Sequence, residues 1–133
     1  PKPFMDGAKQ AYEMIVTAFA EGNRDMLRNL LSDEVFAGFD AAIQDRESRG
    51  EQIDQSFVGI HSADVVEASL EGDEANVTIK FFSQLITATR DSNREVISGD
   101  PHKVQDLTDI WTFARDVTSP NPNWFLIATQ APG

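Results

Sequence analysis

The residues that could carry chemistry lie in the last third of the chain. Asp109 and Arg115 end a stretch in which large and small side chains alternate, Asp-Ile-Trp-Thr-Phe-Ala-Arg. Such alternation is typical of a β-strand, in which successive side chains point to opposite faces. Trp111 and Phe113 therefore share one face with the two charges. At a rise of about 3.3 Å per residue, the two charges are roughly 20 Å apart and do not pair with each other.

Asp109 has two interpretations, one catalytic and one structural. In apolar surroundings its pKa would be raised, and it could act as a general base, as buried carboxylates do in some isomerases. A base of this kind needs a paired acid, and no spacing in the sequence provides one. In the structural interpretation, which the sequence favours, Asp109 and Arg115 each hold a neighbouring loop or helix end through charged hydrogen bonds.

The aromatic residues on the same face are predicted to be either core residues or the wall of a pocket. Trp111 and Phe113 are large enough to dominate the energetics of a core, and core packing is the favoured interpretation. A concave, mainly apolar space between a sheet and a helix is instead the default place for a ligand. The candidate pocket residues are Tyr12, Phe81, Ser83, Asp109, Trp111 and Phe113.

Three helices are predicted in the first 50 residues. Apolar residues recur at spacings of three and four over residues 4–19, and Gly22 ends this helix. A short second helix is expected over residues 24–31. Ser32 is a good N-cap for a third helix, which stops at Gly50. The expected apolar sides of the second and third helices are Met26, Leu27, Leu30 and Leu31, and Val35, Phe36, Phe39, Ala42 and Ile43.

The rest of the chain is predicted to form a four-stranded antiparallel sheet. The predicted strands are 53–70, 77–86, 104–116 and 124–129, and turn residues cluster at 71–74, 91–94, 98–101 and 119–123. The first two strands make a long hairpin, and alternation in the second places Phe81 and Ser83 on one face and Phe82 on the other. The last strand is apolar on both sides, as expected of a strand covered on both faces.

This order of elements predicts the fold class. Helices first and an antiparallel sheet after them is the order of an α+β domain. Elements of these lengths fit a cone, in which a curved sheet wraps round a long first helix. No internal repeat or low-complexity linker interrupts the chain, so we expect a single domain over residues 1–133.

Composition argues against several classes of function. The chain has 22 acidic and 11 basic residues and a net charge of -11, and its basic residues do not cluster. This balance opposes binding to nucleic acid and to anionic lipid. There is no cysteine, and His61 and His102 lie far apart without a metal-binding pattern, so we expect no metal and no cofactor. No apolar run approaches the roughly 20 residues that span a bilayer.

Several motifs together resemble the Tim44-like domain family. The motifs are Ala11 to Phe19, Arg46-Glu47 with Gly50, Gly99-Asp100-Pro101, Asp109 to Asp116, and Asn121-Pro122-Asn123-Trp124. Their combined spacing extends over nearly the whole chain. The resemblance implies a cone-shaped fold like that of nuclear transport factor 2, used in mitochondria by a peripheral inner-membrane module that helps to tether the protein-import motor.

The resemblance also implies where such a domain works. Similar domains occur in alphaproteobacterial proteins behind an N-terminal membrane segment. The strong acidity of this chain, and its lack of a basic leading segment, favour a bacterial relative at the inner membrane over a mitochondrial one. The sequence opens at Pro1 without a methionine or a signal pattern, so we expect a processed protein or a fragment of a longer one, held at the membrane by an upstream segment.

The expected function is that of a non-enzymatic, membrane-associated adaptor. It would bind a protein partner, a membrane lipid or a hydrophobic ligand through its cavity, with Trp124 joining Asp109 and Arg115 as structural anchors. Phe4 and Met5 are either the first turn of the first helix or a membrane-facing lead-in. The alternative is a small enzyme of the same fold, an isomerase or hydratase with Asp109 as general base.

Overall fold

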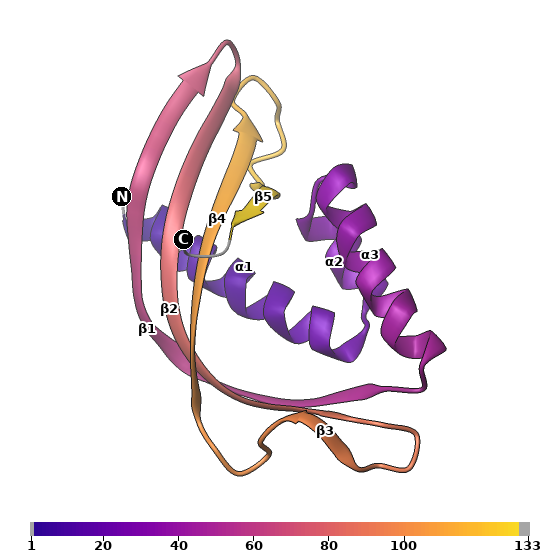
Figure 1. Cartoon of the computed structure of the whole chain (residues 1–133). Helices are drawn as coiled ribbons and strands as arrows, with labels where there is room; N and C mark the ends of the chain where they lie inside the picture. Colours follow the sequence, from indigo (N-terminus) through magenta and orange to yellow (C-terminus); the bar gives the residue numbers. More distant parts are fainter. Residues whose placement is uncertain (1, 131–133) are drawn as a thin grey trace.

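The computed structural model describes residues 2–130 and shows an α+β domain, as predicted (Figure 1). Three helices come first, and the strands of one sheet follow. The elements are α1 (Lys2–Glu21), α2 (Arg24–Leu30), α3 (Asp33–Ser48), β1 (Gln52–Glu71), β2 (Glu74–Arg90), β3 (Val96–Gly99), β4 (Gln105–Asp116) and β5 (Phe125–Gln130). All of them except β3, which is exposed, contribute to one hydrophobic core. The single domain expected over 1–133 also includes residues 1 and 131–133, which lie outside the described part.

The sheet has the order β1-β2-β4-β5, and β3 pairs with the far end of β2. The four predicted strands are all present, and β3 is a fifth that the sequence did not suggest. Residues 98–101 were expected to be only a turn, but Ser98 and Gly99 pair with Thr89 and Ala88. Gly99 has a φ of +74°, and a Cβ there would lie 2.3 Å from the carbonyl oxygen of Thr87. Only glycine permits this close approach.

The two longest strands, β1 and β2, bend and carry the sheet around α1, as Figure 1 shows. Three irregularities interrupt their pairing, between Phe57 and Gly59, between Ile60 and Ser62, and between Val65 and Glu67. Such bulges bend a strand and increase its twist. The result is a concave face against which α1 packs.

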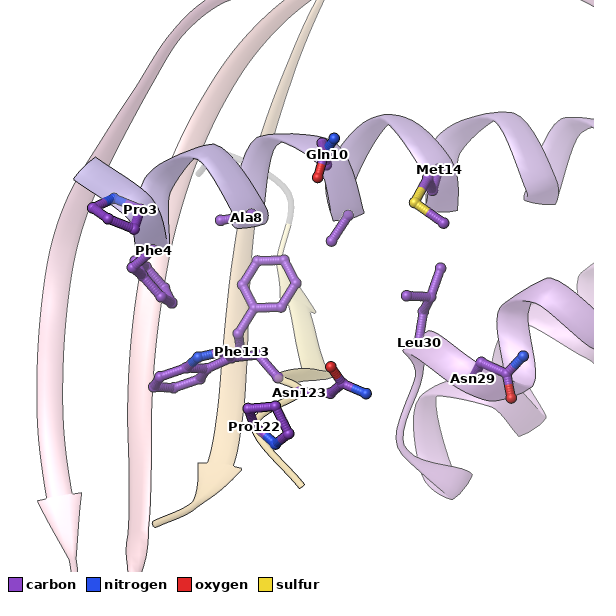
Figure 2. Close-up of a pocket in the computed structure, with 13 residues that line it drawn as sticks. Pro3, Phe4, Ala8, Gln10, Met14, Asn29, Leu30, Phe113, Pro122 and Asn123 are labelled. Atoms are coloured by element: carbon purple, nitrogen blue, oxygen red, sulfur yellow. The ribbon is translucent and has the colours of Figure 1, made fainter. Parts of the chain in front are cut away.

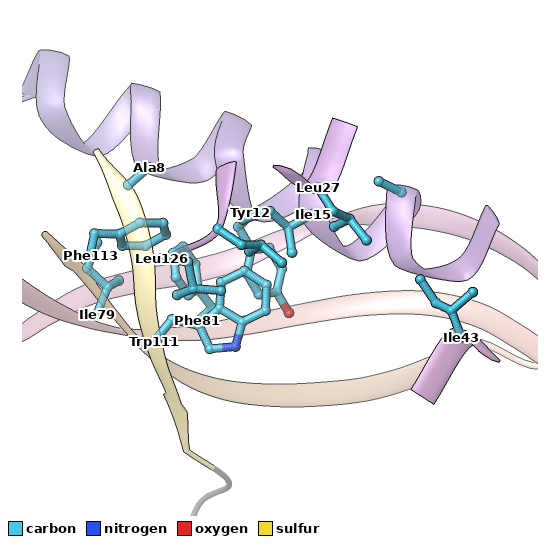
Figure 3. Close-up of a cluster of buried hydrophobic side chains, with 12 residues drawn as sticks. Ala8, Tyr12, Ile15, Leu27, Ile43, Ile79, Phe81, Trp111, Phe113 and Leu126 are labelled. Carbon is cyan, nitrogen blue, oxygen red and sulfur yellow. The ribbon is translucent and has the colours of Figure 1, made fainter. Parts of the chain in front are cut away.

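The core lies between α1 and this concave face (Figure 3). Ala8, Tyr12 and Ile15, spaced by four and three residues, form the buried stripe of α1. Opposite them, Ile79 pairs with Trp111 and Val77 pairs with Phe113 across β2 and β4. Directly paired residues share a face, so the predicted alternation is confirmed in both strands.

The helix ends follow the predicted capping chemistry. The side chain of Asn23 accepts a hydrogen bond from Met26 N, and Ser32 Oγ accepts one from Val35 N at 3.3 Å. Gly50 follows the C-terminal end of α3 with a φ of +70°. These residues satisfy backbone groups that a helix cannot satisfy by itself.

Some burial predictions were wrong. Met26 and Ala42 are exposed, because α2 and α3 pack on α1 and β5 along one side only. In β5, Leu126 is buried but residues 128–130 are exposed, because an edge strand that helices touch only near its start is not covered on both faces. Arg46, a charged residue in the last turn of α3, is only 8% exposed.

Candidate functional site

Tyr12 is the centre of the candidate site. α1 places its hydroxyl between β2 and β4, where it donates to Asp109 Oδ2 at 2.7 Å and lies 2.8 Å from Ser83 Oγ. Because the one hydroxyl proton of Tyr12 goes to Asp109, Ser83 is the donor to Tyr12 Oη. Tyr12 and Ser83 are buried and Asp109 is half-buried. Three elements far apart in sequence are thus joined by two side-chain hydrogen bonds.

Aromatic rings pack around Tyr12, the central residue of this hydrogen-bonded group (Figure 3). The ring of Tyr12 stacks on Phe81 with centroids 4.3 Å apart, and its centroid lies 4.6 Å from that of Trp111. Phe113 makes edge-to-face contacts with both Phe81 and Trp111. The rings fill the space between α1 and the middle of the sheet, so they form a core here and not an open cavity.

Burial dominates the electrostatics of the group. It raises the pKa of Asp109, and the hydrogen bond from Tyr12 offsets part of that rise. Burial also raises the pKa of Tyr12; the hydrogen bond from Ser83 acts in the opposite direction, and the carboxylate of Asp109 adds to the rise. The raised pKa keeps Tyr12 a neutral donor, and burial disfavours the charged form of Asp109 more than the hydrogen bond from Tyr12 stabilises it.

Two hollows open from the surface toward this core. The first, which we call the helix groove, lies between α1, the end of α2 and the segment before β5, and has a volume of about 560 Å³ (Figure 2). Met14 and Leu30 face it from the two helices, and Phe4 packs edge-to-face on Trp124 at its end, with ring centroids 4.9 Å apart. Its lining consists of Pro3, Phe4, Gly7, Ala8, Gln10, Ala11, Met14, Asn29, Leu30, Phe113, Pro122, Asn123 and Trp124.

The second hollow, which we call the Asp109 pocket, has a volume of about 260 Å³. It lies where the C-terminal half of α1 and the middle of α3 meet β1, β2 and the start of β4. Its lining consists of Ile15, Val16, Phe19, Phe39, Gln55, Leu85, Thr87, Gln105, Asp106, Leu107, Asp109 and Trp111.

The six residues predicted to line one pocket are therefore divided. Asp109 and Trp111 line the Asp109 pocket, and Phe113 lines the helix groove. The linings of both hollows leave out Tyr12, Phe81 and Ser83. The six residues do not line one cavity, because the stacked rings of Tyr12 and Phe81 lie between the two hollows.

The helix groove uses residues that the sequence did not suggest as a site. Gly7, Met14 and Pro122 line it, and none of them belongs to the predicted apolar stripe or sheet faces. One signal was available, since Met14 is a large apolar residue outside the buried stripe of α1 and is 41% exposed. No comparable signal marks Gly7 or Pro122.

The predicted anchors have different environments. Asp109 accepts a hydrogen bond from Tyr12 in the middle of α1. It was expected to hold a loop or a helix end instead. Arg115 is half-buried, and among the described residues its Nε has no hydrogen-bond partner, so the expected fastening is not seen; the nearest residue across the sheet is Ala75. Trp124 is half-buried against Phe4.

The first turns of α1 contain the two residues considered as a membrane-facing lead-in. Phe4 and Met5 are partly buried and pack against the core. Their apolar character therefore has a structural explanation as the start of α1, and a membrane role for them stays a prediction. In the part of the chain that is described, no helix has both the length and the apolar character to span a membrane.

Within residues 2–130, no three His, Cys, Asp or Glu side chains come together as a metal site. The hydroxyl of Tyr12 and the carboxyl group of Asp109, joined by a hydrogen bond, are the pair in the candidate site that most resembles an acid–base pair. Tyr12 is sealed from solvent, however, so only Asp109 can meet a molecule from outside.

Three helices packed on the concave face of an antiparallel sheet define a cone-shaped protein of the nuclear transport factor 2 class. Two solved structures share the fold. The intermembrane-space region of the chloroplast protein ARC6 has a TM-score of 0.55 and 13% identity, covering 92% of this chain and 95% of that one. A conserved protein from Planctomyces limnophilus has a TM-score of 0.53 and 13% identity, and the match covers 99% of this chain and 100% of that one.

Within this class, the chain belongs to the Tim44-like domain family, whose sequence model matches residues 1–131. This confirms the resemblance seen in the motifs. The chain is similar to the mitochondrial import inner membrane translocase subunit TIM44 of Mus musculus, with 25% identity over 119 residues. That match covers 88% of this chain and 26% of the relative, so the chain spans about a quarter of the length of the curated relatives it matches.

Proposed function

We propose that this domain is a non-enzymatic adaptor in a protein-transport assembly at an inner membrane, and that it holds an uncharged, apolar group in the helix groove. One observation carries the proposal. The chain has a net charge of -11 and 25% charged residues, yet among the residues whose side chains are described, 3–130, none that lines the groove is charged. A surface hollow without charge, in a chain this acidic, is suited to an apolar occupant.

The chemistry of the groove supports this occupant. Phe113 and Trp124 supply aromatic surface, and Met14 and Leu30 supply aliphatic surface from facing helices (Figure 2). Methionine is flexible and polarizable, so it adapts to occupants of different shape. The polar groups are the side-chain amides of Gln10, Asn29 and Asn123, which hydrogen-bond without requiring a charge. The volume lies in the range of about 300–1,000 Å³ that is usual for ligand pockets.

The occupant we propose is either the acyl chain of a lipid or the apolar side chains of a partner protein. The relationship to a subunit of a mitochondrial import translocase supports a role in protein transport at an inner membrane. Attachment to that membrane would come from a part of the full-length protein outside this sequence. The acidity of the chain favours a bacterial relative over a mitochondrial one.

Gly7 offers a direct test of the helix groove. It lines the groove in α1, and a Cβ added there would meet no atom within 4 Å. A Gly7→Met variant should therefore fold, gain helix propensity and fill the groove. We expect it to bind a dansyl-labelled fatty acid about tenfold more weakly than the unaltered protein, since the buried apolar contacts are lost. Fluorescence titration measures this.

The matched control is Gly38→Met. Gly38 is also a helical glycine with no atom within 4 Å of an added Cβ, but it lies in α3 and outside the groove. It should bind the probe like the unaltered protein. Equal binding by the two variants, or no binding by the unaltered protein, would contradict the proposed occupant. Flotation of the protein with liposomes then separates a lipid occupant from a protein partner.

An enzymatic role for Asp109 is the weaker alternative. Asp109 lines an open pocket, as a general base must. Its Oδ2 is already taken by the hydroxyl of Tyr12, and the pocket lining contains no His, Lys, Arg or Tyr to act as the paired acid. The geometry therefore supports a binding domain better than an isomerase or hydratase.

A further inference from the structure

The Asp109 pocket contains a half-buried carboxylate without a cationic partner. Among residues 2–130, no ion pair includes Asp109, and the pocket lining has no Lys, Arg or His. A carboxylate that is taken from water is costly unless it is paired or hydrogen-bonded. Asp109 receives one side-chain hydrogen bond, from Tyr12. A cation that entered the pocket would therefore be stabilised by a charge already in place.

The other polar groups of the pocket offer mainly acceptors. Gln55 Nε2 donates to Val16 O at 3.4 Å, and Gln105 Nε2 donates to Thr87 O at 3.5 Å. With their amide nitrogens engaged in this way, both glutamines leave their side-chain oxygens without a donor in the described part of the chain. Asp106 also contributes to the lining, but its carboxylate is exposed and accepts a hydrogen bond from Gln84 Nε2 at 3.1 Å, so Asp109 is the carboxylate that the pocket presents. Apart from the hydroxyl of Thr87, the polar side chains present oxygen to an incoming group.

The walls are aromatic and aliphatic. Phe19 and Phe39 meet edge-to-face with centroids 5.1 Å apart, and Trp111 lines the pocket between them and the core. Ring faces attract cations as well as apolar groups. Arg46 already lies over the ring of Phe19 at 5.1 Å, but it lines a separate hollow and not this one. The pocket thus combines an apolar wall with an acidic floor.

We propose that the Asp109 pocket binds a primary ammonium group on a short apolar stem, with the ammonium at Asp109 and the stem against Phe19, Phe39 and Trp111. An ammonium carries three donors and no acceptor, which matches a set of unpaired oxygens. The pocket volume of about 260 Å³ limits the occupant to a small group. The shared chemistry is found in a free alkylamine and in the lysine side chain of a polypeptide.

The first experiment compares n-pentylamine with n-pentanol, which has the same stem without the charge. The indole N–H signal of Trp111 reports binding in a two-dimensional NMR titration at about pH 8, where the amine is protonated. We expect the amine to bind about tenfold more tightly, because a hydrogen bond to a charged group contributes that much or more. Equal affinities, or no shift of the Trp111 signal with either probe, would overturn the proposal.

Two variants test whether the ammonium binds at the carboxylate of Asp109. Asp109→Asn keeps an oxygen for the hydroxyl of Tyr12 and removes the charge, so the preference for the amine should disappear while pentanol binding is kept. Gln55→Glu adds a carboxylate at the rim without altering the Tyr12 contact, and it should raise the affinity for the amine severalfold. Gln55→Glu still tests the ammonium site if Asp109→Asn does not fold. An amine preference that persists in Asp109→Asn, or is unchanged in Gln55→Glu, contradicts the assignment.

A third arm distinguishes the two sources of the ammonium. A lysine blocked as an amide at both backbone ends should bind more tightly than n-pentylamine if a polypeptide is the natural source, and more weakly if it is a small amine; either result supports the ammonium site. The Gly7→Met variant should bind n-pentylamine like the unaltered protein, because it alters only the helix groove. Failure of this inference is therefore separable from failure of the proposed function.

Discussion

The helix groove and the Asp109 pocket are built from the same elements and differ in chemistry. α1 gives the groove residues between Pro3 and Met14, and gives the pocket Ile15, Val16 and Phe19. β4 likewise gives Phe113 to the groove and Trp111 with Asp109 to the pocket. Among the residues whose side chains are described, the groove lining has no charge, whereas the pocket lining includes the half-buried carboxylate of Asp109. One helix on one sheet thus makes two unlike hollows, separated by Tyr12 and Phe81.

The largest effect should come from removing this partition. Phe81 is fully buried, so Phe81→Ala should lower the free energy of unfolding by about 3–5 kcal/mol and join the two hollows. Its neighbour Phe82 faces the outside of the sheet and is 39% exposed. Phe82→Ala should cost about 0.5 kcal/mol. Urea denaturation compares the two, and equal losses would contradict the placement of Phe81 in the packed core between the hollows.

A smaller loss is expected from the residue that fastens α1 on the pocket side. Arg46 Nη2 donates to Phe19 O at 2.6 Å and to Ala20 O at 3.0 Å, which are carbonyls at the open end of α1. Arg46→Met should lower the free energy of unfolding by about 2–3 kcal/mol, because charge-assisted hydrogen bonds at a buried site are lost.

The same variant should affect the two hollows unequally. Phe19 lines the Asp109 pocket and not the helix groove, so hydrogen exchange in Arg46→Met should rise at the C-terminal end of α1 and stay unchanged near Phe4. Arg49 forms ion pairs with Asp45 and Glu51 and is more than half exposed. Arg49→Met is therefore the control, and it should unfold like the unaltered protein. If hydrogen exchange rose equally along the whole of α1, the two ends of the helix would not be stabilised independently, which would contradict this prediction.

Next in size is the hydroxyl at the centre of the partition. Tyr12→Phe keeps the ring that stacks on Phe81 and removes the hydrogen bonds to Asp109 and Ser83. The loss should be about 1–3 kcal/mol, since two polar groups are left without their partner. Thermal and urea unfolding measure it. A variant as stable as the unaltered protein would mean that the aromatic contacts alone hold α1 here.

The smallest effect concerns pH. Burial raises the pKa of Asp109, so the folded state binds this proton more tightly than the unfolded state does. This favours folding below the unfolded pKa of about 3.9 and is lost as pH rises through the folded pKa. The stability of the unaltered protein relative to Asp109→Asn should therefore fall over the pH range that begins at about 3.9 and extends upward through the raised folded pKa.

Urea unfolding of both proteins across this range makes the comparison. The polar groups near Asp109 are the hydroxyl of Tyr12 from α1 and, through Tyr12, the hydroxyl of Ser83 from β2. Both are present in the two proteins, so the difference reports the charge of Asp109 and its interactions with these groups. A difference that is flat or rises with pH would contradict a burial-raised pKa.

Much of the fold could be predicted because local patterns and global packing agree. The stripe of α1 predicted the burial of Tyr12 and Ile15, and alternation predicted that Phe81 faces inward while Phe82 faces outward. The N-cap role of Ser32 could also be predicted locally, because its side-chain oxygen accepts a hydrogen bond from a backbone N–H only three residues later, that of Val35. β3 escaped prediction because Ser98 and Gly99 are typical of turns, and only their pairing with β2 makes them a strand.

The site was less predictable because it depends on distances between elements. The sequence alone determined which residues face the space between helix and sheet, and that Trp111 and Phe113 bring large rings to it. Whether those rings leave a cavity depends on how closely α1 approaches the sheet, and this is set by the bulges of β1 and by the contact of Tyr12 with Asp109. The tertiary structure therefore decided that one expected pocket became two hollows. It also decided that Arg46, an ordinary charged residue of a helix end, is buried, because α1 ends beside it and the carbonyls of Phe19 and Ala20 accept hydrogen bonds from its guanidinium.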